Sequence, residues 1–141
     1  MWNGQRFHRG HQAPAADHTA SHEQMNETFL LSNMAPQVGI GFNRYIWAYL
    51  EKMVRGWVMC GGRSTLYVIT GPIYGTDASK VLGPNRIAIP DAFYKIVYDP
   101  EHGRAVGLVL ENRRHEDRSL DRKSTRLNSS HSSVSRMPSS A

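Results

Sequence analysis

The chain has 141 residues and a mass of 15.9 kDa, a length at which a single hydrophobic core can sustain one domain. Its composition is 40% hydrophobic and 21% charged with a mean hydropathy of −0.49, and it contains no apolar run long enough to span a bilayer, which excludes an integral membrane protein. The formal charge of +5 favours a nucleic-acid partner only weakly, because residues 121–141 carry +3 of it and residues 1–120 carry +2.

Cys60 is the only cysteine, so neither an internal disulfide nor a cysteine-based zinc site can form. The first ten residues lack the charged segment and apolar segment of a signal peptide. The cellular compartment is therefore left open by these features.

The segment from Asp121 to Ala141 is rich in serine and has no apolar periodicity, which is typical of a disordered basic tail. Its reverse translation also resembles a common short-read sequencing adapter, so we expect this tail to be translated adapter. We therefore predict a partial domain over residues 1–120 and exclude residues 121–141 from the fold.

Between Arg9 and Asn33 the pattern predicts a short strand, a polar loop with room for a helical turn, and a second strand at the apolar run Phe29 to Leu31. Pro36, Gly39 and Gly41 then indicate a loop.

From Asn43 to about Cys60 the apolar residues recur at helical spacing, and two glycines follow. The expected core face comprises Ile46, Leu50, Met53 or Val54, and Trp57. Four short runs rich in valine, isoleucine and aromatics follow the helix and are predicted to be strands: 66–70, 86–89, 93–98 and 105–110. The fold class is therefore α+β, with the helix packed on an antiparallel sheet.

A second stripe runs along the same predicted helix at intervals of four residues: Asn43, Trp47, Glu51 and Arg55. Taken alone, it is most simply a Glu51–Arg55 surface pair with Asn43 capping the helix. The motifs on either side of the helix favour a functional role for this stripe instead.

Five motifs occur in order over about ninety residues. They are Arg9-Gly10-His11-Gln12-Ala13-Pro14-Ala15, Ser32-Asn33-Met34-Ala35-Pro36-Gln37, Phe42-Asn43 with Trp47, Leu50 and Glu51, Thr70-Gly71-Pro72, and Ile89-Pro90-Asp91-Ala92-Phe93-Tyr94-Lys95. This ordered set resembles the DNA/RNA non-specific endonuclease family of the ββα-metal (His-Me finger) class, which includes bacterial secreted nucleases and mitochondrial endonuclease G. The resemblance implies Mg²⁺-dependent hydrolysis of phosphodiester bonds in DNA and RNA, with Mn²⁺ as an alternative ion.

The chemistry of that reaction explains the residue types. A water must lose a proton near neutral pH, which suits His11 as the general base. The resemblance implies Asn43 as the direct ligand of a hydrated Mg²⁺, with Glu51 holding metal-bound waters. Arg9 and Arg55 would hold phosphate through their planar guanidinium groups.

An auxiliary role is expected for Asn33, in orienting either His11 or a phosphate. The proposed site reaches only phosphate, sugar and metal, so low sequence specificity is expected. Trp47 and Trp57 are expected in the core, and Asp91 and Lys95 are expected to support the sheet.

The sequence departs from the family pattern at His8, where relatives usually have Asp, and we expect reduced activity from this change. The family also has further strands before and after these motifs, so we expect a domain truncated at both ends and prone to aggregation. Two other functions stay open: a catalytically impaired nucleic-acid-binding module, and a phosphodiesterase acting on small substrates. The resemblance favours a secreted or periplasmic location and is compatible with a homodimer.

Overall fold

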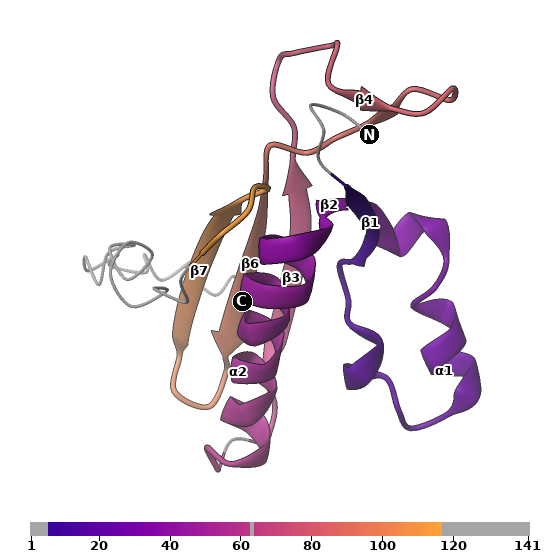
Figure 1. Ribbon diagram of the computed structural model, residues 1–141. Coiled ribbons are helices and arrows are strands. Elements are labelled where there is room, and N and C mark those ends of the chain that lie inside the picture. Colours follow the sequence, from indigo (N-terminus) through magenta and orange to yellow (C-terminus); the bar gives the residue numbers. More distant parts are fainter. Residues whose placement is uncertain (1–5, 63, 117–141) are drawn as a thin grey trace, which may run out of the picture.

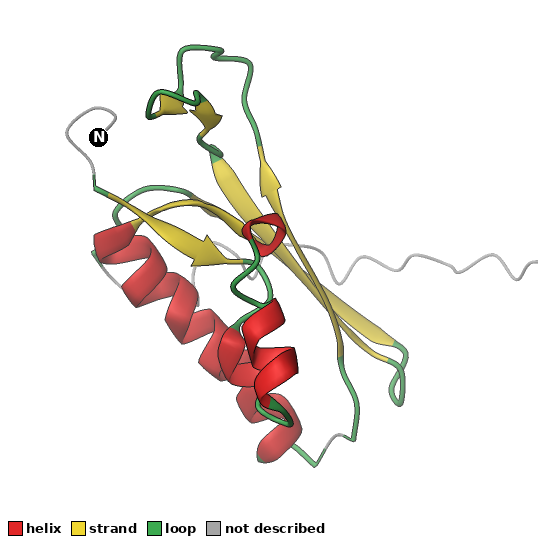
Figure 2. Ribbon diagram, turned by 90° about the vertical axis from the view of Figure 1, so that its right-hand side faces the viewer, coloured by secondary structure: helices red, strands yellow, loops and turns green. Residues whose placement is uncertain are grey.

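The computed structural model describes residues 6–62 and 64–116, so the predicted tail 121–141 lies outside the described residues. A three-stranded antiparallel sheet forms one layer, in the order β3 (Tyr67–Ile73), β6 (Ala92–Asp99) and β7 (Arg104–Glu111). Figure 1 and Figure 2 show one long helical rod packed along a single face of this sheet. The predicted α+β class is confirmed.

The helical rod comprises η3 (Gly39–Trp47), which contains wide π-type turns, and α2 (Ala48–Met59). Ile40 and Gly41 are not helical, and Gly41 has a φ of 87°, so the regular part of the rod begins at Phe42. A side chain at Gly41 would be strained by that φ and would lie 2.5 Å from Cγ of Arg114. The helix predicted over 43–60 is therefore confirmed, with glycine setting the turn that leads into it.

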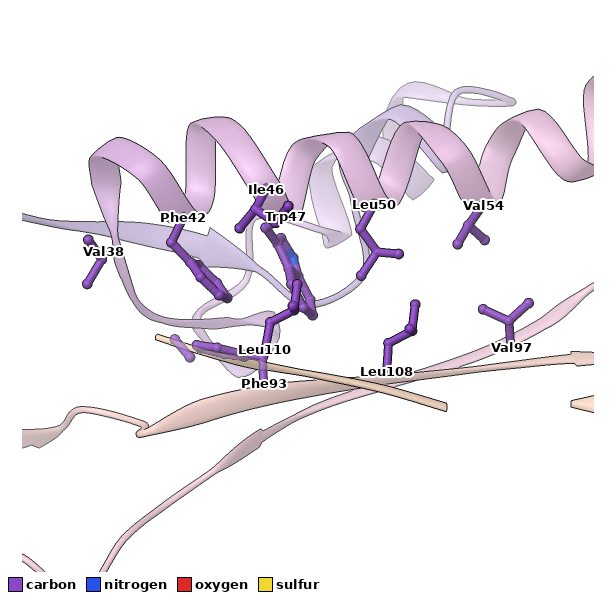
Figure 3. Packing of buried hydrophobic residues seen from close by; sticks show 11 residues of the cluster. Val38, Phe42, Ile46, Trp47, Leu50, Val54, Phe93, Val97, Leu108 and Leu110 are labelled. Carbon is purple, nitrogen blue, oxygen red and sulfur yellow. The ribbon is translucent and has the colours of Figure 1, made fainter. Parts of the chain in front are cut away.

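The core lies between the rod and the sheet (Figure 3). The predicted apolar face of the helix is confirmed, because Ile46, Leu50 and Val54 are buried while Met53 and Trp57 pack at the edge of the cluster. The sheet contributes the inward side chains of β6 and β7, which alternate with outward ones as the pleat requires. These inward residues are Phe93, Val97, Leu108 and Leu110.

A separate two-stranded ribbon carries the N-terminal motifs. β1 (Phe7–His11) pairs antiparallel with β2 (Met34–Val38), in a register that sets Phe7 opposite Val38 and His11 opposite Met34. Both strands contact η3 (Figure 2). The connection between them contains η1 (Ala15–Asp17), α1 (His22–Glu27) and η2 (Leu31–Asn33).

The second strand predicted at 29–31 was wrong. Phe29, Leu30 and Leu31 are 56%, 58% and 75% exposed; the first two lie in a turn, and Leu31 is the first residue of η2. The strand instead includes Pro36, which the sequence pattern placed in a loop. A two-stranded ribbon tolerates proline because each strand has an edge that forms no ladder hydrogen bonds.

The strand predicted at 86–89 forms, but outside the main sheet. β5 (Ile87–Ala88) pairs only with β4 (Val81–Leu82), a strand that the sequence analysis did not identify, and the pair projects beyond the end of the sheet (Figure 1). The other three predicted strands correspond to β3, β6 and β7.

Asn112 joins the ribbon to the sheet. Its side chain is buried, its Oδ1 accepts a hydrogen bond from Val38 N at 2.9 Å, and its Nδ2 donates to Pro36 O at 3.0 Å and Pro90 O at 2.9 Å. The carboxamide thus satisfies three backbone groups from β2 and the segment before β6. This contact holds the strand pair of the N-terminal motifs against the main sheet.

Candidate active site

His11 is the last residue of β1, and its imidazole is partly enclosed. Phe29 packs edge-on against it, with ring centroids 4.7 Å apart and planes at 89°. Its Nε2 is buried and has no hydrogen-bond partner among the described residues. Burial lowers the pKa of His11, so the ring is neutral at neutral pH and can accept a proton. These properties suit a general base, although Phe29 limits access from one side.

Asn43 lies at the start of the regular helix and is oriented by a residue that the sequence analysis did not assign. Its Nδ2 donates to Oε1 of Gln37 at 2.7 Å, which leaves its Oδ1 as the atom available to a metal. Gln37 is fully buried, and its side chain lies against Gly10 in the neighbouring strand. A Cβ at Gly10 would come within 2.1 Å of Cδ of Gln37, so this glycine is required for the close approach.

Glu51 is half-buried, two helical turns after Asn43. The first part of this interval lies in η3 and the rest in α2, so both side chains project from one continuous rod. Burial raises the pKa of Glu51 to about 7, a rise augmented by Asp17 and opposed by Lys95 and, more weakly, by Arg55. Trp47 lies near enough to lower the pKa slightly, although its indole N–H has no hydrogen bond of good geometry.

Arg55 does not pair with Glu51 as the simplest sequence interpretation suggested. Its Nε donates to Oδ1 of Asp17 at 2.5 Å, and both side chains are about one-third exposed. The ion pair connects α2 to η1, the short helix that follows the histidine motif. The two NH₂ groups at the outer end of the guanidinium stay available for a phosphate.

The side chain of Asn33 forms hydrogen bonds with backbone groups. Its Oδ1 accepts from Ala13 N, and its Nδ2 donates to Ala13 O and Thr28 O, each at 2.9 Å. Both amide N–H groups are therefore used, which leaves no donor for a phosphate. Of the two roles expected from the sequence, this arrangement favours orientation of the segment beside His11.

Arg9 is exposed on β1 and lies on the same side of the strand as His11, because residues two apart in a strand share a face. His8 lies on the other side, with its imidazole against Gly39, where the helical rod begins. An aspartate at this position would supply a negative charge that the histidine side chain cannot supply. The reduced activity expected from His8 stays a prediction.

An open pocket of about 800 Å³ adjoins part of this set of residues, although Arg9, His11, Asn43 and Glu51 do not line it. Asn33, Asp17 and Arg55 line it beside a wall of apolar side chains from α2 and β3. Its position places Arg55 at the wall of a cavity rather than on an open helix face.

A second group of potential metal ligands lies elsewhere, at the turn between β6 and β7. Ligand atoms of Asp99, Glu101 and His102 lie within 4.8 Å of one another. Asp99 accepts from the backbone N–H groups of Glu101 and His102 and pairs with the His102 ring at 2.8 Å, contacts that account for the cluster as closure of the turn. It includes none of the residues assigned from the sequence.

Comparisons with known proteins agree with the motif analysis. A family model described as DNA/RNA non-specific endonuclease matches residues 1–134. Nuclease C1 from Cunninghamella echinulata var. echinulata is 44% identical over 108 residues, which cover 71% of this chain and 42% of the relative. Mitochondrial endonuclease G from Homo sapiens is 38% identical over 105 residues, covering 68% of this chain and 34% of the relative.

The solved structure of the EndoG/EndoGI complex matches the fold with a TM-score of 0.69 at 36% identity, over 80% of this chain and 50% of that chain. The chain spans less than half the length of these curated relatives. Within the described part of the chain, no helix has the length and apolarity needed to cross a membrane. Family match, relatives and fold lead to one conclusion: the chain belongs to the DNA/RNA non-specific endonuclease family.

Proposed function

We propose that this protein hydrolyses phosphodiester bonds in DNA and RNA without sequence specificity, in a reaction that depends on Mg²⁺. The observation that carries the proposal is the orientation of Asn43, whose amide nitrogen is held by Gln37 so that its oxygen is left for a cation. An amide oxygen suits Mg²⁺, which retains several of its waters, and the Glu51 carboxylate would bind those waters; Mn²⁺ is an alternative. A bound divalent cation would stabilise the negative charge that develops on the phosphate.

The chain's own residues supply the remaining chemistry. His11, neutral because of its lowered pKa, accepts the proton of the attacking water. Arg9 and Arg55 bind phosphate oxygens, and Glu51 orients water beside Asn43. Asn33 holds the backbone next to His11.

These groups bind phosphate and water rather than the edges of bases, which supports low sequence specificity and action on both DNA and RNA. A homodimer and export from the cytoplasm are further proposals that rest on family resemblance. The names of the relatives do not favour export, because several are called mitochondrial nucleases.

The test is degradation of plasmid DNA and of RNA by the purified protein with Mg²⁺ or with EDTA. We expect cleavage with Mg²⁺, none with EDTA, and a loss of at least about a hundredfold in His11→Ala, because general-base catalysis contributes about that much or more. His22→Ala, at an exposed position on α1, is the matched control and should cleave like the parent. Binding of DNA by a folded, Mg²⁺-supplied protein that does not cut would instead support the impaired binding module.

A further inference from the structure

Lys95 is a cation in the centre of the hydrophobic core. It lies on the inward face of the middle strand β6, between Phe93 and Val97, and it is 1% exposed. Lysine is almost never this buried unless a carboxylate pairs with it. In the described part of the chain no ion pair joins Lys95 to an acidic residue within 4.0 Å, so its burial requires another explanation.

The contacts of the ammonium group are few and neutral. Nζ donates to Oγ1 of Thr70 at 2.7 Å and lies 4.9 Å from the centre of the Trp47 ring. The acidic groups that act on it electrostatically are Glu51 and, more weakly, Asp17, while burial lowers its pKa. Lys95 thus lies under the helix stripe that contains Glu51, without touching the carboxylate.

Stability alone does not account for this charge. Burying an ammonium group without a paired anion costs free energy, and an apolar side chain of similar length would fill the same space. A buried ammonium group without an ion-pair partner among the described residues, lying over Trp47 one helical turn before Glu51, is a candidate for a functional role. The positive charge of Lys95 lowers the pKa of Glu51 and so favours the ionised carboxylate.

We propose that Lys95 is a positioning residue of the active site, whose buried ammonium group supplies the positive charge against which the Glu51 carboxylate is held ready to bind water. The inference rests on the role proposed for Glu51 in the nuclease reaction. Lys95 is suited to it because its position in the middle strand is rigid and excluded from solvent, so its field is weakly screened.

The other groups around Glu51 do not replace Lys95. Arg55, from the same helix, is already paired with Asp17 of η1, and that aspartate raises the pKa of Glu51. Trp47 offers only a neutral N–H. Among these neighbours, Lys95 makes the largest contribution toward the charged carboxylate.

The direct test is the titration of Glu51 by carbon NMR in protein labelled with ¹³C-glutamate, without metal or nucleic acid. Lys95→Met should raise the pKa of Glu51 further above about 7, because the carboxylate loses its main stabilising charge. Lys52→Met, which removes an exposed lysine next to Glu51 in the chain, should leave the titration unchanged. An unchanged Glu51 pKa in Lys95→Met would overturn the proposal.

Stability and activity form the second test. Lys95→Met should unfold at a urea concentration equal to or higher than that of the parent, yet lose about tenfold in kcat/KM at pH 7 and recover as the pH rises. In a Glu51→Gln background, the same change should have little further effect, because the two residues act as a unit. If Lys95→Met does not fold, the ammonium is a requirement of the fold and the proposal fails.

Lys95→Arg keeps the positive charge and should leave the pKa of Glu51 near that of the parent. If the pKa instead rises as much as in Lys95→Met, the charge of residue 95 does not control Glu51. The NMR result separates this proposal from the proposed function. A parent protein that shows the Lys95-dependent titration but cuts no nucleic acid would refute the nuclease assignment alone.

Discussion

Gln37 orients the side-chain amide of Asn43, the residue proposed to bind the metal ion. Its Oε1 accepts from Nδ2 of Asn43 at 2.7 Å, while its own Nε2 is buried without a partner among the described residues. A buried N–H without a partner costs free energy, so its retention indicates a role other than stability. Gly10 is part of the same arrangement, because only glycine lets the Gln37 side chain lie against β1.

We predict that Gln37→Leu weakens metal-dependent cleavage without unfolding the protein. The Asn43 amide would lose its orienting acceptor, so the Mg²⁺ concentration for half-maximal cleavage should rise by about tenfold or more, as is typical when a group supporting a metal ligand is removed. Cleavage measured across a Mg²⁺ titration checks this, with the exposed Gln24→Leu as the control. An unchanged Mg²⁺ requirement would show that Asn43 is oriented by other contacts.

At the scale of elements, the site depends on how the β1–β2 ribbon is held against the helical rod and the sheet. The Arg55–Asp17 ion pair connects η1 to α2, and Asn112 connects β2 to the segment before β6. The ion pair is exposed and contributes little to stability, whereas the Asn112 contacts are buried. The position of the ribbon therefore rests more on Asn112.

We predict that Asn112→Ala lowers the free energy of unfolding by about 2–4 kcal/mol, because it leaves Val38 N–H and two buried carbonyls without partners. Urea unfolding followed by circular dichroism measures the change. Asn26→Ala, at an exposed position on α1, should differ from the parent by less than about 0.5 kcal/mol. A cost for Asn112→Ala as small as that of the control would mean that the ribbon is held elsewhere.

At the scale of the whole molecule, the sheet has one covered and one open face. α2 covers the inner face of the sheet (Figure 2). On the outer face, large apolar side chains of β3 and β6 are exposed. Ile69 and Ile96 lie opposite each other there and are 58% and 39% exposed. Contiguous exposed apolar surface on a sheet promotes association.

We predict that the chain associates with rising concentration through this outer face, in line with the aggregation expected from the sequence. The double substitution Ile69→Thr and Ile96→Thr should reduce the association, because threonine keeps the strand propensity while removing apolar area. Sedimentation velocity over a concentration series measures it. Ile87→Thr, in the separate β4–β5 ribbon, is the control, and equal association by all three proteins would place the contact elsewhere.

Local patterns in the sequence were sufficient for much of the fold. The 3.6-residue spacing of Ile46, Leu50 and Val54 predicted the helix and its buried face, and runs of β-branched residues predicted three strands of the sheet. The second strand of the ribbon was misplaced because the apolar run at 29–31 is exposed, and Pro36 lies in a strand despite its poor propensity. The position of this strand is set by its pairing with β1, which the propensities of single residues do not predict.

The family and the candidate residues followed from ordered motifs, because each reactive group occupies a fixed place along the chain. The partners of those residues depend on contacts between segments far apart in sequence. Gln37 holds Asn43, Asp17 binds Arg55 across 38 residues, and Lys95 of β6 acts on the charge of Glu51 in α2. By itself the sequence determined the family and proposed the candidate residues, whereas the tertiary structure decided their orientation and charge, since burial and neighbouring charges exist only once the chain has folded.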